Sequence, residues 1–424
     1  MKLLIISPYF PYPLNSGGNT AQYLLIEELR RDIDITLLCP ETEEASYLEL
    51  KSRWPNVDIC VYKIKPEVPE IKQGFVQQVK NTVQSAIVFL KLLLLHQRDN
   101  SLNEVLSPKE HMQYLKLSKI QIEEGFINYI GSIYEKSTFD IVQIEFLPLI
   151  SLGLMFPKTQ LKIFIHHEIG FVRTQREIET LDTISAYDRY IADLTKTDEL
   201  NRLTQYDNVV TFSAEDKNVL KQYIKNRVDV SPFAVQVKDH KKISTFKLSS
   251  IVFLGGEEHY PNKDGLEWFI QNCFKQIREA YPELKLNVVG KWSNTTIKKH
   301  ETVNGIEFLG YVDDLASLLA GQSALIVPLR IGSGIRTKIL EAFAMRLPVI
   351  SSTIGIEGIP AISDIHYLKA DNDQEYISAI TQIYENSNQT IEMTGKAFQD
   401  IVPLYEINRC ALTRINLYKD LVQK

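Results

Sequence analysis

The sequence predicts an α/β protein with two Rossmann-like, doubly wound domains that face each other across a cleft. Three observations lead to this prediction. The chain has 424 residues, which is too long for one ordinary hydrophobic core. Short apolar runs alternate with helical patterns, and this order favours parallel sheets with right-handed crossovers. After a polar and basic segment at 237–242, the strand and glycine-turn pattern of the amino terminus starts again near residue 250.

The composition is typical of soluble globular proteins, with 44% hydrophobic and 24% charged residues. The formal net charge of −6 argues against nucleic acid as the main partner. The four cysteines form no CxxC pair, so neither a zinc site nor a disulfide framework is indicated, and a reducing cytoplasm fits. The apolar run at 1–8 is too short for the core of a signal peptide and is predicted to be the first strand.

The first domain is expected to span residues 1–235. Its glycine-bearing loop, Asn15–Thr20, precedes a predicted helix at 21–30 and has no GxGxxG pattern, so a dinucleotide is not implied. This loop either only turns the chain or brings backbone amides toward a phosphate or sugar. One long charged helix is predicted at 177–204. The predicted strands are 2–7, 34–39, 57–64, 139–145, 162–166 and 207–213.

The region at about 66–125 is predicted to be mostly helical and includes an apolar run at 86–95. This run is about half as long as a membrane-spanning helix needs to be. It is either a buried helix or the place where the first domain makes peripheral contact with a membrane.

The second domain is expected to span residues 236–404, and the tail after 391 is predicted to be helical with a break at Pro403. The predicted strands are 251–254, 284–289, 306–309, 324–328 and 348–351.

His167 and Glu168 directly follow the predicted strand 162–166. Ligands of open α/β sheets bind at the carboxyl edge, where these side chains should lie. On pattern alone, the histidine is either a structural hydrogen-bonded group or a ligand-binding one. Successive side chains after a strand point apart, so His166, His167 and Glu168 are not expected to bind one metal ion.

A second candidate site combines a strand, a glycine loop and a helix. Gly332, Ser333 and Gly334 precede a helix whose first turn is expected to carry Arg336 and Lys338. Free backbone N–H groups and the helix dipole favour an anion at such an end, whereas cations there are unfavourable for the helix itself. The pattern predicts a phosphate site, although an ordinary strand-loop-helix unit with surface basic residues also fits.

The same region resembles the donor-site signature of the retaining glycosyltransferases of family 4, the group 1 glycosyl transferases. The matching residues are Pro328-Leu329, Gly332-Ser333-Gly334, Arg336, Lys338, Glu341-Ala342, Pro348-Val349 and Gly355-Ile356-Glu357-Gly358. The resemblance implies the GT-B fold, in which a last helix at 405–424 completes the first domain. It also implies a metal-independent enzyme without a cofactor, located in the cytoplasm or at the inner face of the membrane.

The implied reaction moves a sugar, with retention, from a nucleoside-diphosphate sugar to a hydroxyl of a glycan or lipid-linked acceptor, in surface polysaccharide or glycoconjugate biosynthesis. The resemblance assigns catalytic roles to His167, Glu168 and Arg336. The implied donor-binding residues are Gly17, Gly18, Gly256, Lys263, Tyr311, Val312, Gly332, Ser333, Gly334, Ile335, Arg336, Thr337, Lys338 and Glu341.

The sequence departs from this family pattern at two positions. Ser333 stands eight residues before Glu341, where typical members carry a glutamate that touches the transferred sugar, and Gly256 stands where an arginine is common. Our hypothesis is that Arg336 and Lys338 supply the missing positive charge. Two alternatives stay open: a GT-B enzyme of another class, namely a sugar-nucleotide epimerase or an inverting transferase, and a non-catalytic GT-B accessory protein.

Overall fold

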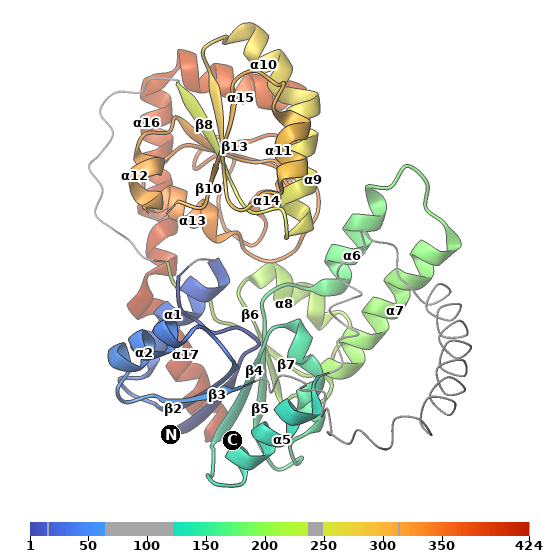
Figure 1. Ribbon diagram of the computed structural model, residues 1–424, viewed down its shortest axis with the longest axis vertical. Helices are drawn as coiled ribbons and strands as arrows, with labels where there is room; N and C mark the ends of the chain where they lie inside the picture. Colours follow the sequence, from blue (N-terminus) through green and yellow to red (C-terminus); the bar gives the residue numbers. More distant parts are fainter. Residues whose placement is uncertain (15–16, 64–121, 236–248, 313, 424) are drawn as a thin grey trace, which may run out of the picture.

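The computed structural model describes residues 1–14, 17–63, 122–235, 249–312 and 314–423. Two α/β domains lie one above the other along the long axis of the molecule (Figure 1). The helices expected near 66–125, the apolar run at 86–95 and the polar segment at 237–242 fall mainly or wholly outside the described residues. Among the helices that are described, none is both long and apolar enough to cross a membrane.

The first sheet has seven parallel strands in the order β3-β2-β1-β4-β5-β6-β7. Its central strands are buried almost throughout, including the polar residues of β4 and β5, because helices cover both faces of a parallel sheet. The edge strand β7 was not predicted, since its sequence RVDV alternates polar and apolar residues over only four positions. The strands are β1 (Lys2–Ile6), β2 (Asp34–Pro40), β3 (Asp58–Tyr62), β4 (Ile141–Glu145), β5 (Lys162–His166), β6 (Asn208–Thr211) and β7 (Arg227–Val230).

The single long helix predicted at 177–204 is wrong, because the chain forms two helices there. Ser185 begins the second helix with a capping box, in which its hydroxyl accepts the N–H of Asp188 while the Asp188 carboxylate accepts the N–H of Ser185. The helices of this domain are α1 (Gly17–Leu29), α2 (Glu44–Arg53), α5 (Glu124–Tyr134), the 3-10 helix η1 (Leu147–Leu154), α6 (Gly170–Glu179), α7 (Ala186–Leu203) and α8 (Ala214–Lys221).

The second sheet has six parallel strands in the order β10-β9-β8-β11-β12-β13. Its two-residue edge strand is too short to leave a pattern in the sequence. The strands are β8 (Ser250–Leu254), β9 (Lys285–Val289), β10 (Ile306–Gly310), β11 (Ala324–Val327), β12 (Val349–Ser351) and β13 (Leu368–Lys369). Two parallel sheets with helices around them confirm the predicted fold class.

The helices of the second domain follow its strands in the usual alternation. They are α9 (Tyr260–Phe269), η2 (Ile270–Phe274), α10 (Lys275–Ala280), α11 (Asn294–His300), α12 (Leu315–Ala320), α13 (Thr337–Ala344), α14 (Thr353–Ile356), α15 (Asp373–Glu385), α16 (Ser387–Lys396), η3 (Ala397–Ile401) and η4 (Val402–Tyr405).

The last helix, α17 (Ile407–Val422), leaves the second domain and packs against α1 of the first (Figure 1). Its Arg414 is fully buried and donates from Nε to the hydroxyl of Ser231 at 2.8 Å. Its Tyr418 is also fully buried, and the hydroxyl donates to the side-chain oxygen of Gln143 on β4. The carboxyl end of the chain therefore contributes polar groups to the interior of the first domain.

Candidate functional site

The loop before α13 reaches across to the first domain. Gly332 and Gly334 have φ angles of 127° and 78°, which favour glycine. A Cβ atom at Gly334 would lie only 2.7 Å from the carbonyl oxygen of His167, which follows β5. The carboxyl ends of β5 and β11 therefore face each other, and glycine allows the two backbones to approach so closely. We call residues 332–334 the glycine loop.

Arg336 occupies the N-cap position just before α13, without a capping hydrogen bond from its side chain, and is 9% exposed. Its Nη1 donates to the carbonyl oxygens of Ser333 and Gly334, whereas Nε and Nη2 find no hydrogen-bond partner within the described residues. Burial lowers the pKa of this guanidinium, although the Glu168 carboxylate partly opposes the shift. A buried cation with two unused donors can be stabilised by an anion that enters the site.

Lys338 lies in the first turn of α13. Its Nζ donates to the carbonyl oxygen of Leu254, at the end of β8, and to Oδ1 of Asn262 at 3.1 Å. Burial lowers the pKa of Lys338 to about 7, and the charge of Arg336 lowers it further while that of Glu341 opposes the shift. A phosphate nearby would favour the charged form of this lysine.

Glu168 brings a carboxylate from the first domain to the glycine loop. It accepts the N–H of Ser333 at 3.3 Å and a hydrogen bond from Nη1 of Arg173 at 3.2 Å. Burial acts to raise the pKa of Glu168, but Arg173, His259 and Arg336 together hold it below its usual value. One loop amide is therefore already occupied by an ionised side chain.

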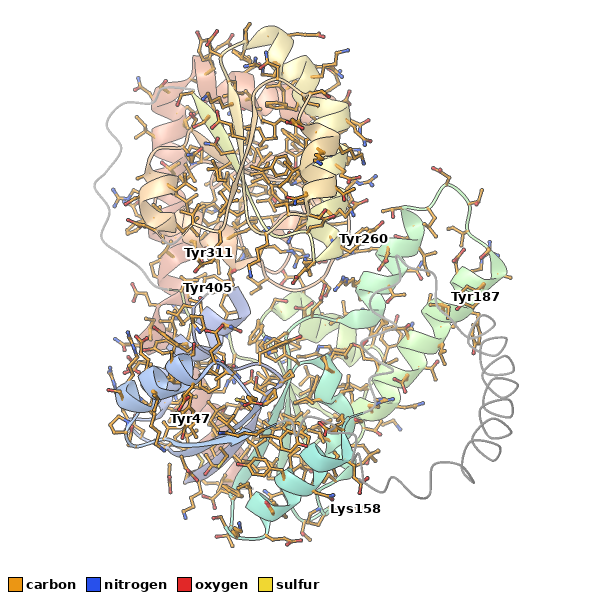
Figure 2. The ribbon with its side chains drawn as sticks, viewed as in Figure 1. Tyr47, Lys158, Tyr187, Tyr260, Tyr311 and Tyr405 are labelled. Carbon is orange, nitrogen blue, oxygen red and sulfur yellow. The ribbon has the colours of Figure 1, made fainter. Side chains whose placement is uncertain are left out.

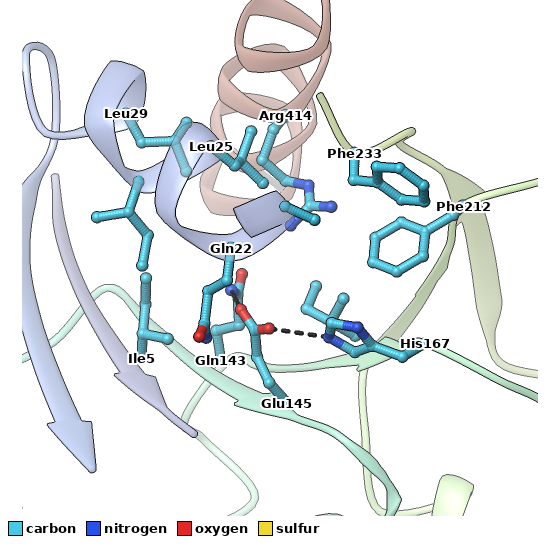
Figure 3. A pocket seen from close by; sticks show the side chains of 13 residues that line it. Ile5, Gln22, Leu25, Leu29, Gln143, Glu145, His167, Phe212, Phe233 and Arg414 are labelled. Carbon is cyan, nitrogen blue, oxygen red and sulfur yellow. Dashed lines mark hydrogen bonds and ion pairs between the residues drawn. The ribbon is translucent and has the colours of Figure 1, made fainter. Parts of the chain in front are cut away.

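His167 is held by contacts on three sides. Its Nε2 lies 3.0 Å from Oε2 of Glu145, which ends the neighbouring strand β4 (Figure 3). Its ring stacks on Phe146, with centroids 3.6 Å apart, and meets the edge of Phe212 at 5.0 Å. The side chain is 16% exposed, so part of it stays accessible.

A groove of about 290 Å³ lies between the domains beside α13, and we call it the interdomain groove. Thr337 forms part of its wall and lies so close to Gly17 of α1 that a Cβ at residue 17 would clash with the threonine hydroxyl. Burial raises the pKa of Glu341, another wall residue. The groove is lined by Leu14, Gly17, Thr20, Ala21, Ala234, Val235, Asp314, Leu315, Ala316, Leu319, Thr337, Glu341, Ala344 and Met345.

Several of the predicted residues lie at the margins of this arrangement. Gly18 packs on the ring of Phe146, whose nearest atom would be 3.7 Å from a Cβ at residue 18. Ile335 is half-buried. Tyr311 and Val312 precede the groove-lining residue Asp314 in the chain but are not among its lining residues. Tyr311 is exposed, and Figure 2 shows it on the rim of the second domain that faces the first.

Gly256 and Lys263 have partners inside the second domain. Gly256 accepts from Nδ2 of Asn262 at 3.2 Å, so Asn262 connects it to Lys338. Lys263 pairs with Glu257 at 2.9 Å, and its charge is therefore already balanced within the domain. The structure thus brings the glycine loop, Arg336, Lys338 and the residues after β5 together, but not Lys263.

Glu145 and Arg176 support the site from behind, and neither was predicted from the sequence to belong to it. Glu145 had a detectable signal, because it ends a buried strand at the ligand-binding edge. Arg176 had none: its Nη1 donates to the carbonyl oxygen of Gly332 at 2.5 Å, and the guanidinium forms two hydrogen bonds with Glu357 at 2.6 and 2.7 Å. These contacts join α6 to the second domain.

No group of three or more His, Cys, Asp and Glu side chains in the described part of the chain is arranged to hold a metal ion. The metal-independent reaction implied by the resemblance stays a prediction.

Residues 249–386 match the family model described as glycosyl transferases group 1. The chain is 23% identical over 424 residues to an uncharacterized 44.6 kDa protein in the cps region of Klebsiella pneumoniae, with 96% of each chain covered.

Similar solved structures cover almost the whole chain. Sucrose-phosphate synthase from Thermosynechococcus elongatus has a TM-score of 0.68 and 14% identity, with 99% of this chain and 98% of that chain covered. TarM of S. aureus has a TM-score of 0.63 and 13% identity over 98% of both chains. HepE of Anabaena, in complex with UDP, has a TM-score of 0.62 and 11% identity, with 99% and 100% covered. At such identities the likeness concerns the fold, which is GT-B; together with the family model, these findings support a group 1 glycosyltransferase.

Proposed function

We propose that the protein transfers a sugar from a nucleoside-diphosphate sugar to a hydroxyl group of a glycan or lipid-linked acceptor, with retention of configuration. One observation carries the proposal. The amino end of α13 holds the buried Arg336 and the half-buried Lys338, and Thr337 and Glu341 of the same helix line a groove shared by both domains. The glycine loop before this helix meets the backbone of His167 on the opposite domain. Such an end favours a diphosphate, and the facing domain is then in reach of the sugar.

Each part of the donor has a proposed partner. The diphosphate binds at the glycine loop, Ile335, Arg336 and Lys338, since charge-assisted hydrogen bonds to phosphate are strong. The ribose diol binds Glu341 in the interdomain groove, which has a size suitable for a small ligand. The base lies toward Tyr311 and Val312. Gly17, which lines the groove, and the neighbouring Gly18 are proposed to face the sugar.

In the proposed reaction, the bond between the anomeric carbon and the diphosphate oxygen breaks. The acceptor oxygen forms a new bond to that carbon on the same face, and its proton passes to the departing diphosphate. Arg336 and Lys338 stabilise the negative charge that develops on the leaving group. His167 and Glu168 orient the sugar and the acceptor. A ligand must compete with Glu168 if it is to use the amide of Ser333, which this carboxylate occupies at 3.3 Å.

Two findings support the choice of donor and of biological process. HepE was solved in complex with UDP-glucose, and TarM in complex with UDP, which favours a uridine donor. The Klebsiella pneumoniae relative is encoded in a cps region, which favours surface polysaccharide biosynthesis. In this proposal the protein works in the cytoplasm or at the inner face of the membrane.

Donor binding is tested by thermal unfolding of the full chain with a panel of nucleoside-diphosphate sugars. We expect at least one to raise the midpoint, because a ligand that binds only the folded state stabilises it. Arg336→Ala should abolish the shift. The control is Arg278→Ala, which removes an arginine on α10 that donates to the carbonyl oxygen of Leu284. No shift with any donor, or equal shifts in both variants, would contradict the proposed site.

The stereochemistry of transfer is tested separately by NMR of the product. An α-linked product from an α-linked donor agrees with retention, and a β-linked product would indicate an inverting transferase. Ser333 favours a second candidate function, a non-catalytic accessory protein, because it replaces the sugar-binding glutamate of the resembled family. Donor binding without any hydrolysis or transfer would support that candidate.

A further inference from the structure

Glu145 lies behind His167 in a chain of hydrogen bonds that ends at the last helix. Its Oε2 accepts from His167, and its Oε1 accepts from Nε2 of Gln143 at 2.7 Å. The side-chain oxygen of Gln143 in turn accepts from the hydroxyl of Tyr418 on α17. Every donor in this series of hydrogen bonds faces an acceptor, so the series fixes the orientation of the Gln143 amide. None of these three residues was predicted from the sequence to belong to the site.

The interior around Glu145 is built for an ionised carboxylate. Burial acts to raise the pKa of Glu145, but the hydrogen bond and charge of His167, the charge of Arg414 and the amide of Gln143 together hold it below its usual value. Arg414 is fully buried beside Tyr418, with its Cζ 5.9 Å from the ring centroid. Figure 3 shows Arg414, Gln143 and Glu145 around one small cavity that His167 also lines.

This arrangement selects one tautomer of His167. An ionised carboxylate can only accept hydrogen bonds, so Nε2 must carry the proton. Within the described residues, Nδ1 of His167 takes part in no hydrogen bond. In the neutral ring this atom is an acceptor, and Phe146 and Phe212 fix the plane in which it lies.

We propose that Glu145 is a positioning residue for the transfer reaction: with Gln143 and Tyr418, it holds His167 in one ring orientation and with Nδ1 as the acceptor for a hydroxyl of the donor sugar or acceptor. The inference rests on the proposed function. In this proposal the helix α17, which follows the second domain in the sequence, helps through Tyr418 to hold His167 of the first domain.

The alternative is an ordinary buried ion pair that only stabilises the fold. Two features argue against it. The side chain of His167 keeps 16% of its surface exposed, whereas that of Glu145 keeps 6%. The glycine loop also approaches the backbone of His167 directly, at the carbonyl oxygen. His167, one member of the pair, therefore lies where the two domains meet rather than in a closed core.

Glu145→Gln provides a sharp test, because both carboxylate oxygens accept hydrogen bonds in the wild-type protein. A glutamine has one acceptor and one donor, so it can keep its contacts with both Gln143 and His167 only if His167 moves its proton to Nδ1 or the Gln143 amide turns. We expect turnover to fall about 10- to 100-fold, as for other groups that orient a reactive residue. The KM for the donor should change by less than about threefold, since the diphosphate site is not touched. Loss of donor binding with unchanged turnover would contradict the positioning role.

Tyr418→Phe tests the last member of this series of hydrogen bonds. It should reduce turnover about three- to tenfold, because the Gln143 amide loses its fixed orientation. The matched control is Tyr206→Phe, which removes another buried hydroxyl of the first domain, one that donates to the carbonyl oxygen of Ile150 at 2.7 Å. Equal turnover in the two variants would overturn the proposal.

The tautomer is measured independently of activity by NMR of protein labelled with ¹⁵N-histidine, with His167→Asn used to assign the signal. We expect the Nε2-protonated form in the wild-type protein and a mixture in Glu145→Gln. A wild-type signal from the Nδ1-protonated form would refute the inference, whatever the reaction. Absence of nucleotide-sugar binding, with the expected tautomer present, would instead refute only the proposed function.

Discussion

Two neighbouring histidines of this protein have the same kind of partner but different surroundings. His166 contacts Glu199 at 2.9 Å and His167 contacts Glu145 at 3.0 Å, each through Nε2. The first pair is enclosed, with side chains 1% and 2% exposed, whereas His167 reaches the meeting point of the domains. Successive side chains at the end of a strand point to opposite faces, and this alternation alone separates the two roles.

The partner of the enclosed histidine also has a second task. Glu199 accepts the backbone N–H groups of Gly170 at 3.1 Å and Phe171 at 2.9 Å, which begin α6. A carboxylate in this position satisfies amides that the helix leaves free and complements its dipole. A buried histidine–carboxylate pair is therefore a candidate for function only when one of its members is partly exposed and lies where the two domains meet, as His167 does.

The largest effect is expected for Glu199→Ala, which breaks the enclosed pair and uncaps α6. Removing one partner of a buried pair costs about 3–5 kcal/mol, so the thermal midpoint should fall well below that of the wild-type protein. The measurement is calorimetry or circular dichroism at neutral pH. An unchanged midpoint would mean that the enclosed pair has no structural role, and the comparison would fail.

His167→Ala should have a somewhat smaller effect, and on activity rather than on folding. We expect transfer or donor hydrolysis to fall about 100-fold, which corresponds to about 2.7 kcal/mol of transition-state stabilisation. The thermal midpoint should change less than it does in His166→Ala, because His167 is the more exposed of the two. If both histidine variants lose activity and stability in equal proportion, the two pairs do not differ in role.

The smallest effect is expected for Glu177, a third buried carboxylate, whose Oε1 has no hydrogen-bond partner among the described residues. Burial raises its pKa to about 7, and the charges of Asp264 and Glu168 add to the shift while that of Arg173 opposes it. The folded state thus keeps this proton after the unfolded chain has lost it. The stability contribution is largest below the ordinary glutamate pKa, declines as pH rises toward about 7, and is level above.

Glu177→Gln should remove this dependence on pH. The free energy of unfolding of the variant, relative to that of the wild type, should therefore be about 1–3 kcal/mol higher at pH 8 than at pH 5. The control is Glu179→Gln, an exposed position on the same helix. Thermal midpoints at the two pH values test the expectation, and parallel shifts in both variants would contradict it.

The sequence predicted the parts of the site that follow one another in the chain. The glycine loop, the helix after it and the position of His167 after a strand could be predicted, since each depends on local pattern and on the rule that ligands bind at the carboxyl edge. Arg336 was expected in the first turn of that helix, but it is the N-cap residue just before it. The single helix at 177–204 was wrong because its apolar positions continue through a short break, where only the capping box of Ser185 marks the new start.

The partners of those residues could not be predicted. Asn262 holds Lys338 from a helix 76 positions away, and Tyr418 reaches Gln143 across 275 positions. Such pairings depend on how the strands are ordered and on where α17 returns, and neither leaves a local pattern.

By itself, the sequence determined the alternation of strands and helices, the presence of two α/β domains and the candidate anion site at the amino end of α13, because hydrophobic periodicity and glycine placement act over a few residues. Only the tertiary structure decided which cations remain free to meet an anion and which are already paired. It also decided that His167, rather than His166, faces the other domain. The reason is physical: burial, charge pairing and the choice of tautomer are set by neighbours in space, and the long-range contacts that supply these neighbours form only when both sheets are assembled.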